Sequence, residues 1–426
     1  MSIPTTRLGR TGLTAARALV AGGAHVALWD EKLAGRDAAE AEGFKVVDLR
    51  AADWSQFAAL MLSPGVPLTH PQPHWTVKMA QEAGVEILGD IELFARTVNA
   101  APPHKRPKII AITGTNGKST TTALVHHILK TAGVPTLMGG NIGLPILGQE
   151  PLPEGGVYVL ELSSYQIDLT QSLDCDVAVL LNITPDHLDR YDGFSGYAAS
   201  KAWLFAMQSA GHVAVVGTGD EASAHIAQGL AGRTDDLVTI AASEIDQSRW
   251  PALQGPHNAQ NAQAAIAVAR ELGIGEEAIE MGLASYASLP HRMQHVATRN
   301  GVAFVNDSKA TNPESTAPAL AAFPRVHWIV GGKRKGDDLD ACAAHLDHVV
   351  AAYTIGEAAP LFFDLLRDKV PVVEQSGTLE AAVAHAAAAA RPGDTVLLSP
   401  ACASFDQFRD YEARGEAFRV AVEALA

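Results

Sequence analysis

A short glycine-containing segment, GTNGKST at residues 114–120, constrains the fold of this chain more than any other feature. It follows the apolar, β-branched run KIIAIT (108–113) and leads into residues 119–129, whose apolar side chains recur at helical spacing. A strand, a glycine turn and a helix in this order direct backbone N–H groups and the positive end of the helix toward one point. The segment therefore predicts a phosphate-binding loop in an α/β sheet.

This loop is shorter than the usual one. The pattern G-x-x-x-x-G-K-[ST] has a glycine five residues before its second glycine, and Ile112 occupies that position here. The turn is therefore reduced to Gly114-x-x-Gly117-Lys118-Ser119. Lys118 can reach the terminal phosphates of a nucleotide, and the Ser119 hydroxyl can ligate Mg²⁺. The alternative, an ordinary glycine-rich turn between a strand and a helix, is the less favoured interpretation.

The length of 426 residues predicts about two to four domains, because single hydrophobic cores rarely grow so large. Apolar strand-like segments alternate with Ala/Leu-rich helical ones, which is typical of α/β layers with mostly parallel strands. The segments NAAPPHKRPK (99–108) and YASLPHRMQHV (286–296) lie between helices and strands and read as linkers. We therefore predict three α/β domains, 1–106, 107–290 and 291–426.

The net charge and the cysteine content limit which binding partners and which cellular compartment we expect. A net charge of −15 argues against a general nucleic-acid surface, which needs clustered Lys and Arg. Cys175, Cys342 and Cys402 lie far apart, which fits neither a disulfide framework nor a zinc site and suits a reducing compartment. We see no signal peptide and no apolar run of membrane-spanning length. We expect a cytoplasmic protein without nucleic-acid or membrane partners.

The N-terminal segment has an incomplete dinucleotide-binding pattern. Residues 7–32 contain a turn, a helical stretch and a second strand that ends at Asp30, as in a Rossmann-like domain. The first glycine of G-x-G-x-x-G is replaced by Arg7, however, and MSIPTT (1–6) is a poor strand sequence. We expect a Rossmann-like domain that lacks its first strand or builds it differently, with residues lost upstream as one explanation.

Polar side chains follow two further predicted strands of the central domain. Glu161 ends VYVLE, and His187 follows VAVLL in a loop that also contains Asn182 and two aspartates. Ligands gather at the carboxyl ends of strands in open α/β sheets, so Glu161 and His187 are candidate metal ligands. A surface ion pair and a solvated loop histidine are the alternatives. Residues 195–206 read as a helix with one basic residue, Lys201, which the local sequence places on the surface.

Several motifs occur in a recognisable order along the chain. They are TGTNGKST, GGNIGLP, ELSSYQ, NITPDHLDRY, GPHNAQN, LPHR, NDSKATNP and LSPACASFDQF. In this set and over nearly its whole length the chain resembles the Mur ligases of peptidoglycan synthesis. The resemblance implies a UDP-substrate domain, a central P-loop ATPase domain and a Rossmann-like domain that binds an amino acid. It also implies a monomer that uses ATP to join D-glutamate to UDP-N-acetylmuramoyl-L-alanine through an acyl phosphate.

The resemblance assigns roles residue by residue. The expected ATP site comprises Gly114, Thr115, Asn116, Gly117, Lys118, Ser119, Thr120, Asn258, Asn261, Arg292 and Asp307. Two Mg²⁺ ions are expected on Ser119, Glu161, His187 and a carbamylated Lys201, with Lys118, His187 and Lys201 as catalytic residues. The expected UDP-substrate contacts are Gly9, Arg10, Thr11, Asp30, Ser63, Pro64, Gly65, Asn141, Ser163 and Gln166. The D-glutamate pocket is expected from Lys309, Thr311, Lys335, Ser404 and Tyr411, the last standing where relatives more often have Phe.

Three other functions remain open at this point. A sibling ligase, above all folylpolyglutamate synthetase, would share the loop and the domain plan, but Ser119-Thr120 and the segment ACASFDQF argue against it. A P-loop kinase or nucleotide switch would have little use for NDSKATN. A non-catalytic binder of UDP-sugars is motivated only by the incomplete N-terminal pattern. A substrate screen separates these possibilities.

Overall fold

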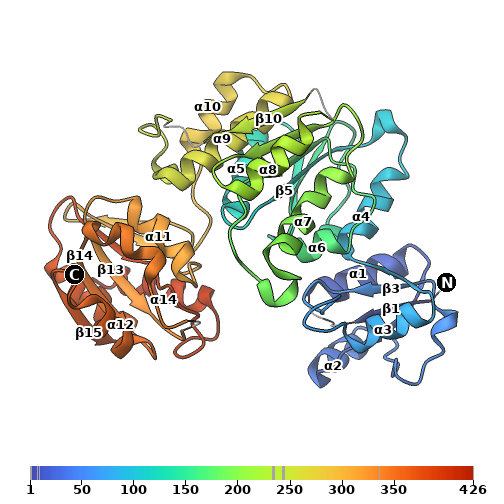
Figure 1. Cartoon of the computed structure of the whole chain (residues 1–426), viewed down its shortest axis with the longest axis horizontal. Helices are drawn as coiled ribbons and strands as arrows, with labels where there is room; N and C mark the ends of the chain where they lie inside the picture. The colour runs from blue at the N-terminus through green and yellow to red at the C-terminus, as the bar shows by residue number, and fades with distance from the viewer. Residues whose placement is uncertain are drawn as a thin grey trace. The chain divides into compact units, whose positions relative to one another are not determined.

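The chain forms three β-sheets, each covered by helices (Figure 1). The computed structural model describes residues 2–6, 8, 10–232, 236–241, 245–334 and 336–425. The chain divides into two compact units. The first comprises Met1–Ala242 with Gln263–Gly282, and the second comprises Ser243–Ala262 with Leu283–Ala426. The α/β class and the parallel character predicted from the sequence are confirmed, since every strand pair but one is parallel among the described residues.

The N-terminal sheet has four parallel strands in the order β2-β1-β3-β4. Its strands are β1 (Ser2–Thr6), β2 (His25–Trp29), β3 (Ala59–Leu62) and β4 (Glu86–Leu88). Helices α1 (Arg10–Ala21) and α2 (Leu33–Ala41) pack on one face through Ala15, Ala16 and Ala39, and α3 (Trp75–Glu82) packs on the other through Val77 and Ala80. A 3₁₀ turn, η1 (Trp54–Gln56), precedes β3.

Of the two alternatives for the N-terminal domain, the missing first strand was wrong, and the first strand is built from the unusual sequence at residues 2–6. Ser2–Thr6 forms β1, which pairs with β2 along its whole length and with β3 at Thr5 and Thr6. Pro4 has no N–H to donate, but it precedes the two residues that pair with β3, so it does not break that ladder. The strand is held by its position between two apolar neighbours rather than by its own β-propensity.

The central sheet has six parallel strands in the order β10-β9-β8-β5-β7-β6. They are β5 (Lys108–Thr113), β6 (Thr136–Gly140), β7 (Val157–Glu161), β8 (Val177–Leu180), β9 (Val213–Gly217) and β10 (Leu237–Ile240). The helices are α5 (Lys118–Thr131), α6 (Ser164–Asp168), α7 (Gly193–Ala206), α8 (Glu221–Leu230), α9 (Pro256–Glu271) and α10 (Glu276–Ser285). Short 3₁₀ turns are η2 (Pro103–Lys105), η3 (Ile146–Gly148), η4 (Leu188–Arg190) and η5 (Pro251–Leu253). The predicted strand 108–113 and the helix that follows it are confirmed.

One helix joins the N-terminal segment to the central core. Helix α4 (Asp90–Asn99) precedes the proline-rich linker, yet Ile91, Phe94, Ala95 and Val98 belong to the same buried cluster as the strands of the central sheet. Helices α6, α7 and α8 contribute to that cluster as well. The Phe94 ring meets Tyr158 of β7 edge-on, with ring centroids 4.9 Å apart. This helix is therefore packed as a helix of the central layer.

The C-terminal sheet has six strands in the order β11-β12-β16-β13-β14-β15, with β11 antiparallel at one edge. They are β11 (Gln294–Arg299), β12 (Val302–Asn306), β13 (Val326–Gly331), β14 (Val349–Ile355), β15 (Val373–Gly377) and β16 (Thr395–Leu398). Helices α11 (Pro313–Ala321) and α12 (Ala359–Leu366) with η6 (Asp340–His348) cover one face, and α13 (Leu379–Ala389) and α14 (Tyr411–Glu423) cover the other. The result is a three-layer α/β/α arrangement.

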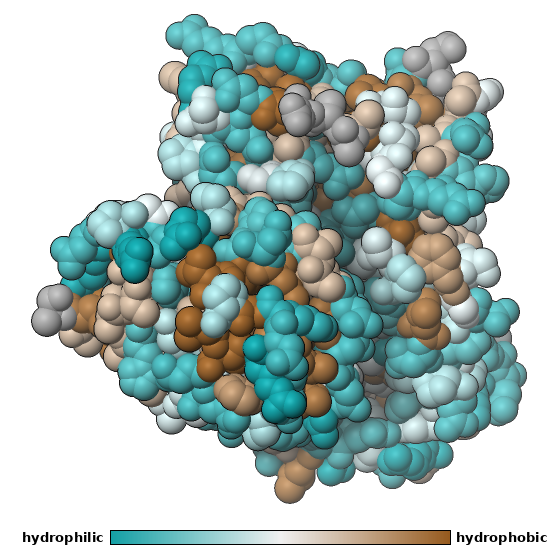
Figure 2. All heavy atoms as spheres, turned by 60° about the vertical axis from the view of Figure 1, so that its left-hand side comes forward, coloured by the Kyte–Doolittle hydropathy of each residue, from teal (hydrophilic) through white to brown (hydrophobic). Residues whose placement is uncertain are grey.

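The molecular surface is mixed in character. Figure 2 shows a face that is largely hydrophilic, with one area in which apolar side chains gather. Apolar atoms make up a large part of any folded protein's surface. Within the described ranges, every helix is too short or too polar to span a lipid bilayer.

Candidate active site

The glycine turn lies at the carboxyl end of the central strand β5, between the ends of β7 and β8. Gly117 has a φ of 84°, a left-handed conformation that favours glycine, and Lys118 begins α5 directly after it. Gly114 has a φ of 149°, and a side chain there would come within 3.1 Å of Leu181 Cβ. The two glycines thus let the backbone turn tightly into the helix, which directs the first N–H groups of α5 into the loop.

Residues that follow β8 hold this loop in place. Asn182 accepts the Thr115 N–H at its carbonyl (2.8 Å) and the Asn116 N–H at its side-chain oxygen (2.9 Å). The Thr115 hydroxyl accepts the Thr184 N–H at 3.0 Å and lies 3.1 Å from the Tyr197 hydroxyl. The loop is therefore preorganised by the neighbouring strand end, a role that sequence reasoning did not assign to Asn182.

Two lysines meet at one backbone carbonyl of the loop. Lys118 Nζ donates to the carbonyl oxygens of Gly114 (2.9 Å) and Thr115 (2.7 Å), and Lys201 Nζ donates to the same Gly114 oxygen at 2.9 Å. Lys201 lies on α7 and is only 1% exposed, so the local interpretation of a surface lysine was wrong. Burial, and then the charge of Lys118, hold the pKa of Lys201 well below its usual value.

Glu161 lies beside the loop at the end of β7. Its side chain is 2% exposed, which rules out the alternative of a surface ion pair. Oε1 accepts a hydrogen bond from Asn141 Nδ2 at 2.8 Å, whereas Oε2 has no hydrogen-bond partner. A buried carboxylate oxygen without a partner is costly unless something else binds it. The Ser119 hydroxyl group, on the first turn of α5, is also buried.

This set of donors suits Mg²⁺ at a bound phosphate. In the described part of the chain, no three or more His, Cys, Asp and Glu side chains gather as a metal site by themselves. Mg²⁺ at nucleotide sites commonly takes one or two carboxylates and completes its octahedron with phosphate oxygens and water. The unpartnered Glu161 Oε2 and the Ser119 hydroxyl therefore fit the ion that the sequence predicted.

His187 lies in the loop after β8 and has a left-handed φ of 52°. Its side chain is half-exposed, and its Nε2 is 3.5 Å from Asp186 Oδ2. The ring centroid is 5.2 Å from that of Tyr165. Burial and the nearby charges of Lys118 and Lys201 lower the pKa of His187, against the raising effect of Asp186. A neutral imidazole can offer its lone pair to a metal ion.

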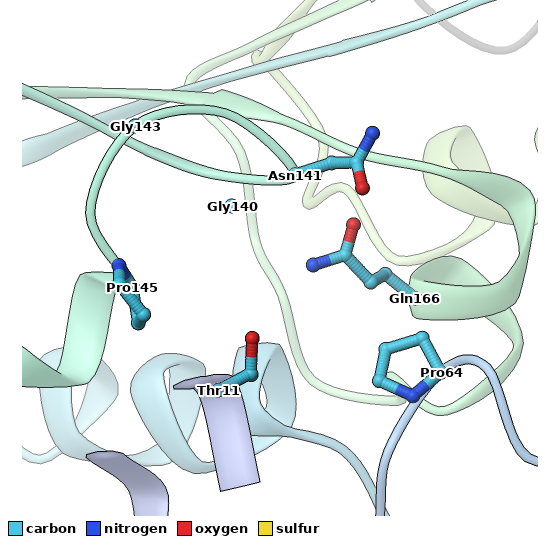
Figure 3. Close-up of a pocket in the computed structure, with 7 residues that line it drawn as sticks. All are labelled: Thr11, Pro64, Gly140, Asn141, Gly143, Pro145 and Gln166. Atoms are coloured by element: carbon cyan, nitrogen blue, oxygen red, sulfur yellow. The ribbon is translucent and has the colours of Figure 1, made fainter. Parts of the chain in front are cut away.

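A cavity of about 270 Å³ brings together predicted contacts from distant parts of the sequence. Figure 3 shows the carboxamides of Asn141 and Gln166 near one another, with Thr11 of α1 and Pro64 of the loop after β3 below them. Ser163 caps α6 and donates from its N–H and its hydroxyl to Gln166 Oε1, which fixes that side chain. The cavity is lined by Thr11, Pro64, Gly140, Asn141, Gly143, Pro145 and Gln166.

A second cavity, of about 420 Å³, opens next to the end of β2. Asp30 and Gly65 are among its lining residues. Asp30 Oδ2 accepts the Leu8 N–H at 2.5 Å, and Oδ1 accepts the Lys32 N–H at 2.8 Å. Ser63 is buried and donates its hydroxyl to the Thr6 carbonyl. Two other predicted contacts, Gly9 and the side chain of Arg10, lie outside the described residues.

The remaining predicted ATP residues belong to the second unit. Asn258 and Asn261 are buried on the first turns of α9, and Asn261 Nδ2 donates to Asn258 Oδ1 at 3.1 Å. Arg292 lies between two left-handed residues, with φ 62° at position 291 and 46° at position 293. Asp307 follows β12 and accepts the Ser399 hydroxyl at 2.7 Å, and burial raises its pKa to about 7.

The predicted amino-acid pocket draws on the ends of β12 and β16 and on the start of α14. Lys309 Nζ lies 4.0 Å from the ring centroid of Tyr411, a cation–π contact, and Ser404 is 2% exposed. Thr311 is partly buried, and Lys335 lies outside the described residues. Sequence reasoning missed Arg414, which is buried beneath these segments. A single arginine in a helical stretch gives no indication in the sequence that its side chain is buried.

Comparison with known proteins identifies the class. The Mur ligase middle domain matches residues 112–251, and the Mur ligase, glutamate ligase domain matches residues 291–402. The chain belongs to the Mur ligase family. Among curated relatives, the UDP-N-acetylmuramoylalanine--D-glutamate ligases of Novosphingobium aromaticivorans and Sphingopyxis alaskensis are each 58% identical over 98% of this chain, and the matches cover 93% and 96% of those proteins.

Solved structures share the fold at low sequence identity. The UDP-N-acetylmuramate-alanine ligase MurC of Thermotoga maritima aligns with a TM-score of 0.59 and 18% identity, covering 100% of this chain and 99% of that one. A pseudomurein peptide ligase type C from Methanothermus fervidus aligns with a TM-score of 0.57 and 18% identity, covering 99% of each chain. These likenesses describe the architecture alone.

Proposed function

We propose that this chain is an ATP-dependent ligase that adds D-glutamate to UDP-N-acetylmuramoyl-L-alanine in peptidoglycan precursor synthesis. Curated relatives named UDP-N-acetylmuramoylalanine--D-glutamate ligase are 54–58% identical over 98% of this chain. The observation that carries the chemistry is the meeting of Lys118 and Lys201 at the Gly114 carbonyl, beside the unpartnered Glu161 oxygen. Phosphoryl transfer needs fixed positive charge and positioning far more than covalent participation by the protein.

The reaction has two steps. A carboxylate oxygen of the alanyl group attacks the γ-phosphorus of ATP, the bond from that phosphorus to the bridging oxygen breaks, and ADP leaves with that oxygen. The product is an acyl phosphate. The amine of D-glutamate then attacks the acyl carbon, the carbon–oxygen bond to phosphate breaks, and the new amide nitrogen gives up a proton. Lys118 stabilises the phosphoryl group as charge moves through it, because its Nζ is already held at the loop.

Ser119, Glu161 and His187 would hold the metal ions. When bound, Mg²⁺ neutralises charge on the phosphate oxygens and on the reacting carboxylate. Glu161 is kept in position by Asn141, whose side chain donates to Oε1 and leaves Oε2 available. Two ions are part of the proposal, with His187 on the one nearer the alanyl carboxylate.

Lys201 is proposed to act as a carbamate. A protonated lysine would add a second cation beside Lys118 in a buried site, which is unfavourable. Its lowered pKa favours the neutral amine, and that is the form that reacts with CO₂. The nitrogen forms a bond to the CO₂ carbon, a proton leaves, and the side chain becomes an anion with two oxygens. Oxygen is the ligand that Mg²⁺ prefers.

The two cavities are the proposed binding places for the nucleotide-sugar. Asp30 and Gly65 are proposed to contact its uridine end, and Thr11, Pro64, Asn141 and Gln166 to contact the portion nearer the alanyl group. Asn258, Asn261, Arg292 and Asp307 are proposed to bind the nucleotide, and Lys309, Thr311, Lys335, Ser404 and Tyr411 to bind D-glutamate. We also propose that the enzyme is monomeric and cytoplasmic, and that the three domains have the predicted bounds 1–106, 107–290 and 291–426.

Phosphate release from ATP tests this function directly. With UDP-N-acetylmuramoyl-L-alanine present, we expect release to require D-glutamate and to be at background with L-glutamate. Equal turnover of the two enantiomers, or turnover that requires a folate acceptor, would refute the assignment. An absence of phosphate release with a folate acceptor would also exclude folylpolyglutamate synthetase, the sibling ligase that the sequence left open.

A further inference from the structure

Arg414 is a buried cation that forms no ion pair, although the more distant charge of Asp406 acts on it. It lies on the first turns of α14 and is 1% exposed. In the described part of the chain, no carboxylate lies within ion-pair distance of it, and its guanidinium donates hydrogen bonds to neutral oxygens. Burial lowers the pKa of the guanidinium to about 10, so it stays protonated at neutral pH. Such a distant carboxylate offsets only part of the cost of burying a charge, so a further anion nearby would be favourable.

The bonds of this guanidinium connect two chain segments. Nε donates to the Ser308 hydroxyl at 2.9 Å, and Nη2 donates to the Ser308 carbonyl at 2.9 Å. Nη2 and Nη1 also donate to the carbonyls of Cys402 (3.0 Å) and Ala403 (3.2 Å). Ser308 directly precedes Lys309, and Ala403 directly precedes Ser404. Arg414 therefore ties together the two segments that carry proposed contacts to the amino-acid substrate.

Contacts around Arg414 also hold these two segments in place. The Ser308 hydroxyl donates to the Tyr411 carbonyl at 2.9 Å, and the ring of Tyr411 lies under Lys309 Nζ. Gly332, after β13, approaches so closely that a Cβ there would lie 2.4 Å from the Ala403 oxygen and 3.0 Å from Arg414 Nη1. Three elements of the C-terminal unit thus converge on one arginine, whose rigid, planar fork can serve several acceptors at once.

We propose that Arg414 is a positioning residue for the amino-acid pocket, and that its positive charge, which no ion pair neutralises, favours a dicarboxylate substrate over a neutral one. The proposal rests on the proposed function, because it takes the amino acid to bind near Lys309 and Ser404. The guanidinium does not contact the substrate, since its donors serve backbone and hydroxyl oxygens of the protein. It acts by fixing the two segments and by supplying charge in a poorly solvated place, where charge acts at longer range than in water.

Steady-state kinetics on the full chain can test this inference. Arg414→Met removes both the charge and the hydrogen bonds that fix the two segments, and we expect the KM for D-glutamate to rise roughly 10- to 100-fold, the loss typical when a charged hydrogen-bonding group is removed from a buried network. The KM for ATP should change less than about twofold. Arg414→Lys keeps the charge but not the fork, so its KM for D-glutamate should lie between those of Arg414→Met and the wild type.

The matched control lies on the same helix. Arg419 is also on α14 but is paired with Glu416 and Glu423 on its exposed side. Arg419→Met should therefore leave both KM values unchanged. Unfolding midpoints of all variants show whether each protein is folded, and if Arg414→Met does not fold, Arg414→Lys carries the test alone.

Two results would overturn the inference. One is a folded variant at position 414 whose KM for D-glutamate equals that of the wild type. The other is an equal rise of the KM values for ATP and D-glutamate, which would mean that Arg414 is only structural. Both are distinct from failure of the proposed function, because in that case the wild-type enzyme itself would show no phosphate release that depends on D-glutamate.

Discussion

Asp90, the first residue of α4, should make the stability of this protein depend on pH in an unusual direction. Its side chain is 2% exposed, and burial outweighs the hydrogen bonding of its carboxylate with the backbone of Asp90 and Ile91 and with the side chain of Gln166. Burial raises its pKa from 3.8 to about 6. The native state therefore holds the proton more tightly than the unfolded chain does, so this group lowers stability as pH rises from about 4 to about 6. Above pH 6 the whole loss of unfolding free energy caused by this ionised group is present.

The size of the effect follows from the shift. A pKa change from 3.8 to about 6 corresponds to ~3 kcal/mol against the native state at neutral pH. The favourable interaction of the charge with the N-terminus of the helix is already contained in this shift, so it is not subtracted again. We therefore expect the Asp90→Asn variant to be more stable than the wild type by roughly 3 kcal/mol at pH 7.5 and by roughly 1 kcal/mol at pH 4.5, where the unfolded chain is already mostly ionised at this position.

Calorimetric unfolding of the full chain at the two pH values measures this difference. The gain should appear at pH 7.5 as a rise of roughly 6–12 °C in the midpoint of the transition that contains α4. Asp37→Asn, an exposed aspartate on α2, is the matched control and should show no such difference between the two pH values. Parallel pH profiles of the wild type and Asp90→Asn would refute the reasoning.

Three further predictions concern the site. Lys118→Ala should lower kcat by roughly 10³-fold without unfolding the protein, and a variant that keeps most of its turnover would contradict the phosphate-loop assignment. Lys201→Ala should lose at least about 100-fold in kcat and be partly rescued by a short carboxylic acid, because the vacated space then accepts a carboxylate. A fully active Lys201→Ala protein would end the carbamate proposal. Gly140→Ala should lower the free energy of unfolding by about 3 kcal/mol or more, because φ is 88° there and the new Cβ would lie 2.2 Å from the Glu161 carbonyl oxygen. An unchanged unfolding midpoint would show that the backbone relaxes.

The phosphate loop was predictable because its signals are local. The strand 108–113, the glycines and the start of α5 all lie within one short stretch, and each residue type there has one dominant physical reason. Glu161 was predictable as a strand-end residue, although its burial was not. That burial depends on the strand order, which places β7 directly beside β5.

Long-range packing explains what the sequence alone did not reveal. Lys201 belongs to a helix whose local sequence pattern is typical of a surface lysine. Its Nζ reaches the Gly114 carbonyl, 87 residues earlier in the chain, only because the fold brings the two segments together. Arg414 was missed for the same reason, since its partners at Ser308 and Cys402 come from other strand ends. Ser2–Thr6 was misjudged because a strand between two neighbours needs little intrinsic β-propensity.

Helix α4 has a consequence for how this enzyme can be divided. The covalent link between the N-terminal and central sheets runs through the prolines at 99–108, which looks like a convenient place for a cut. Phe94 and Val98 lie before that link but pack in the core of the central sheet. A fragment that starts after the linker would leave that apolar surface open to water and expose Tyr158. We therefore expect a soluble ATPase fragment to require α4, so the useful boundary for truncation lies before Asp90.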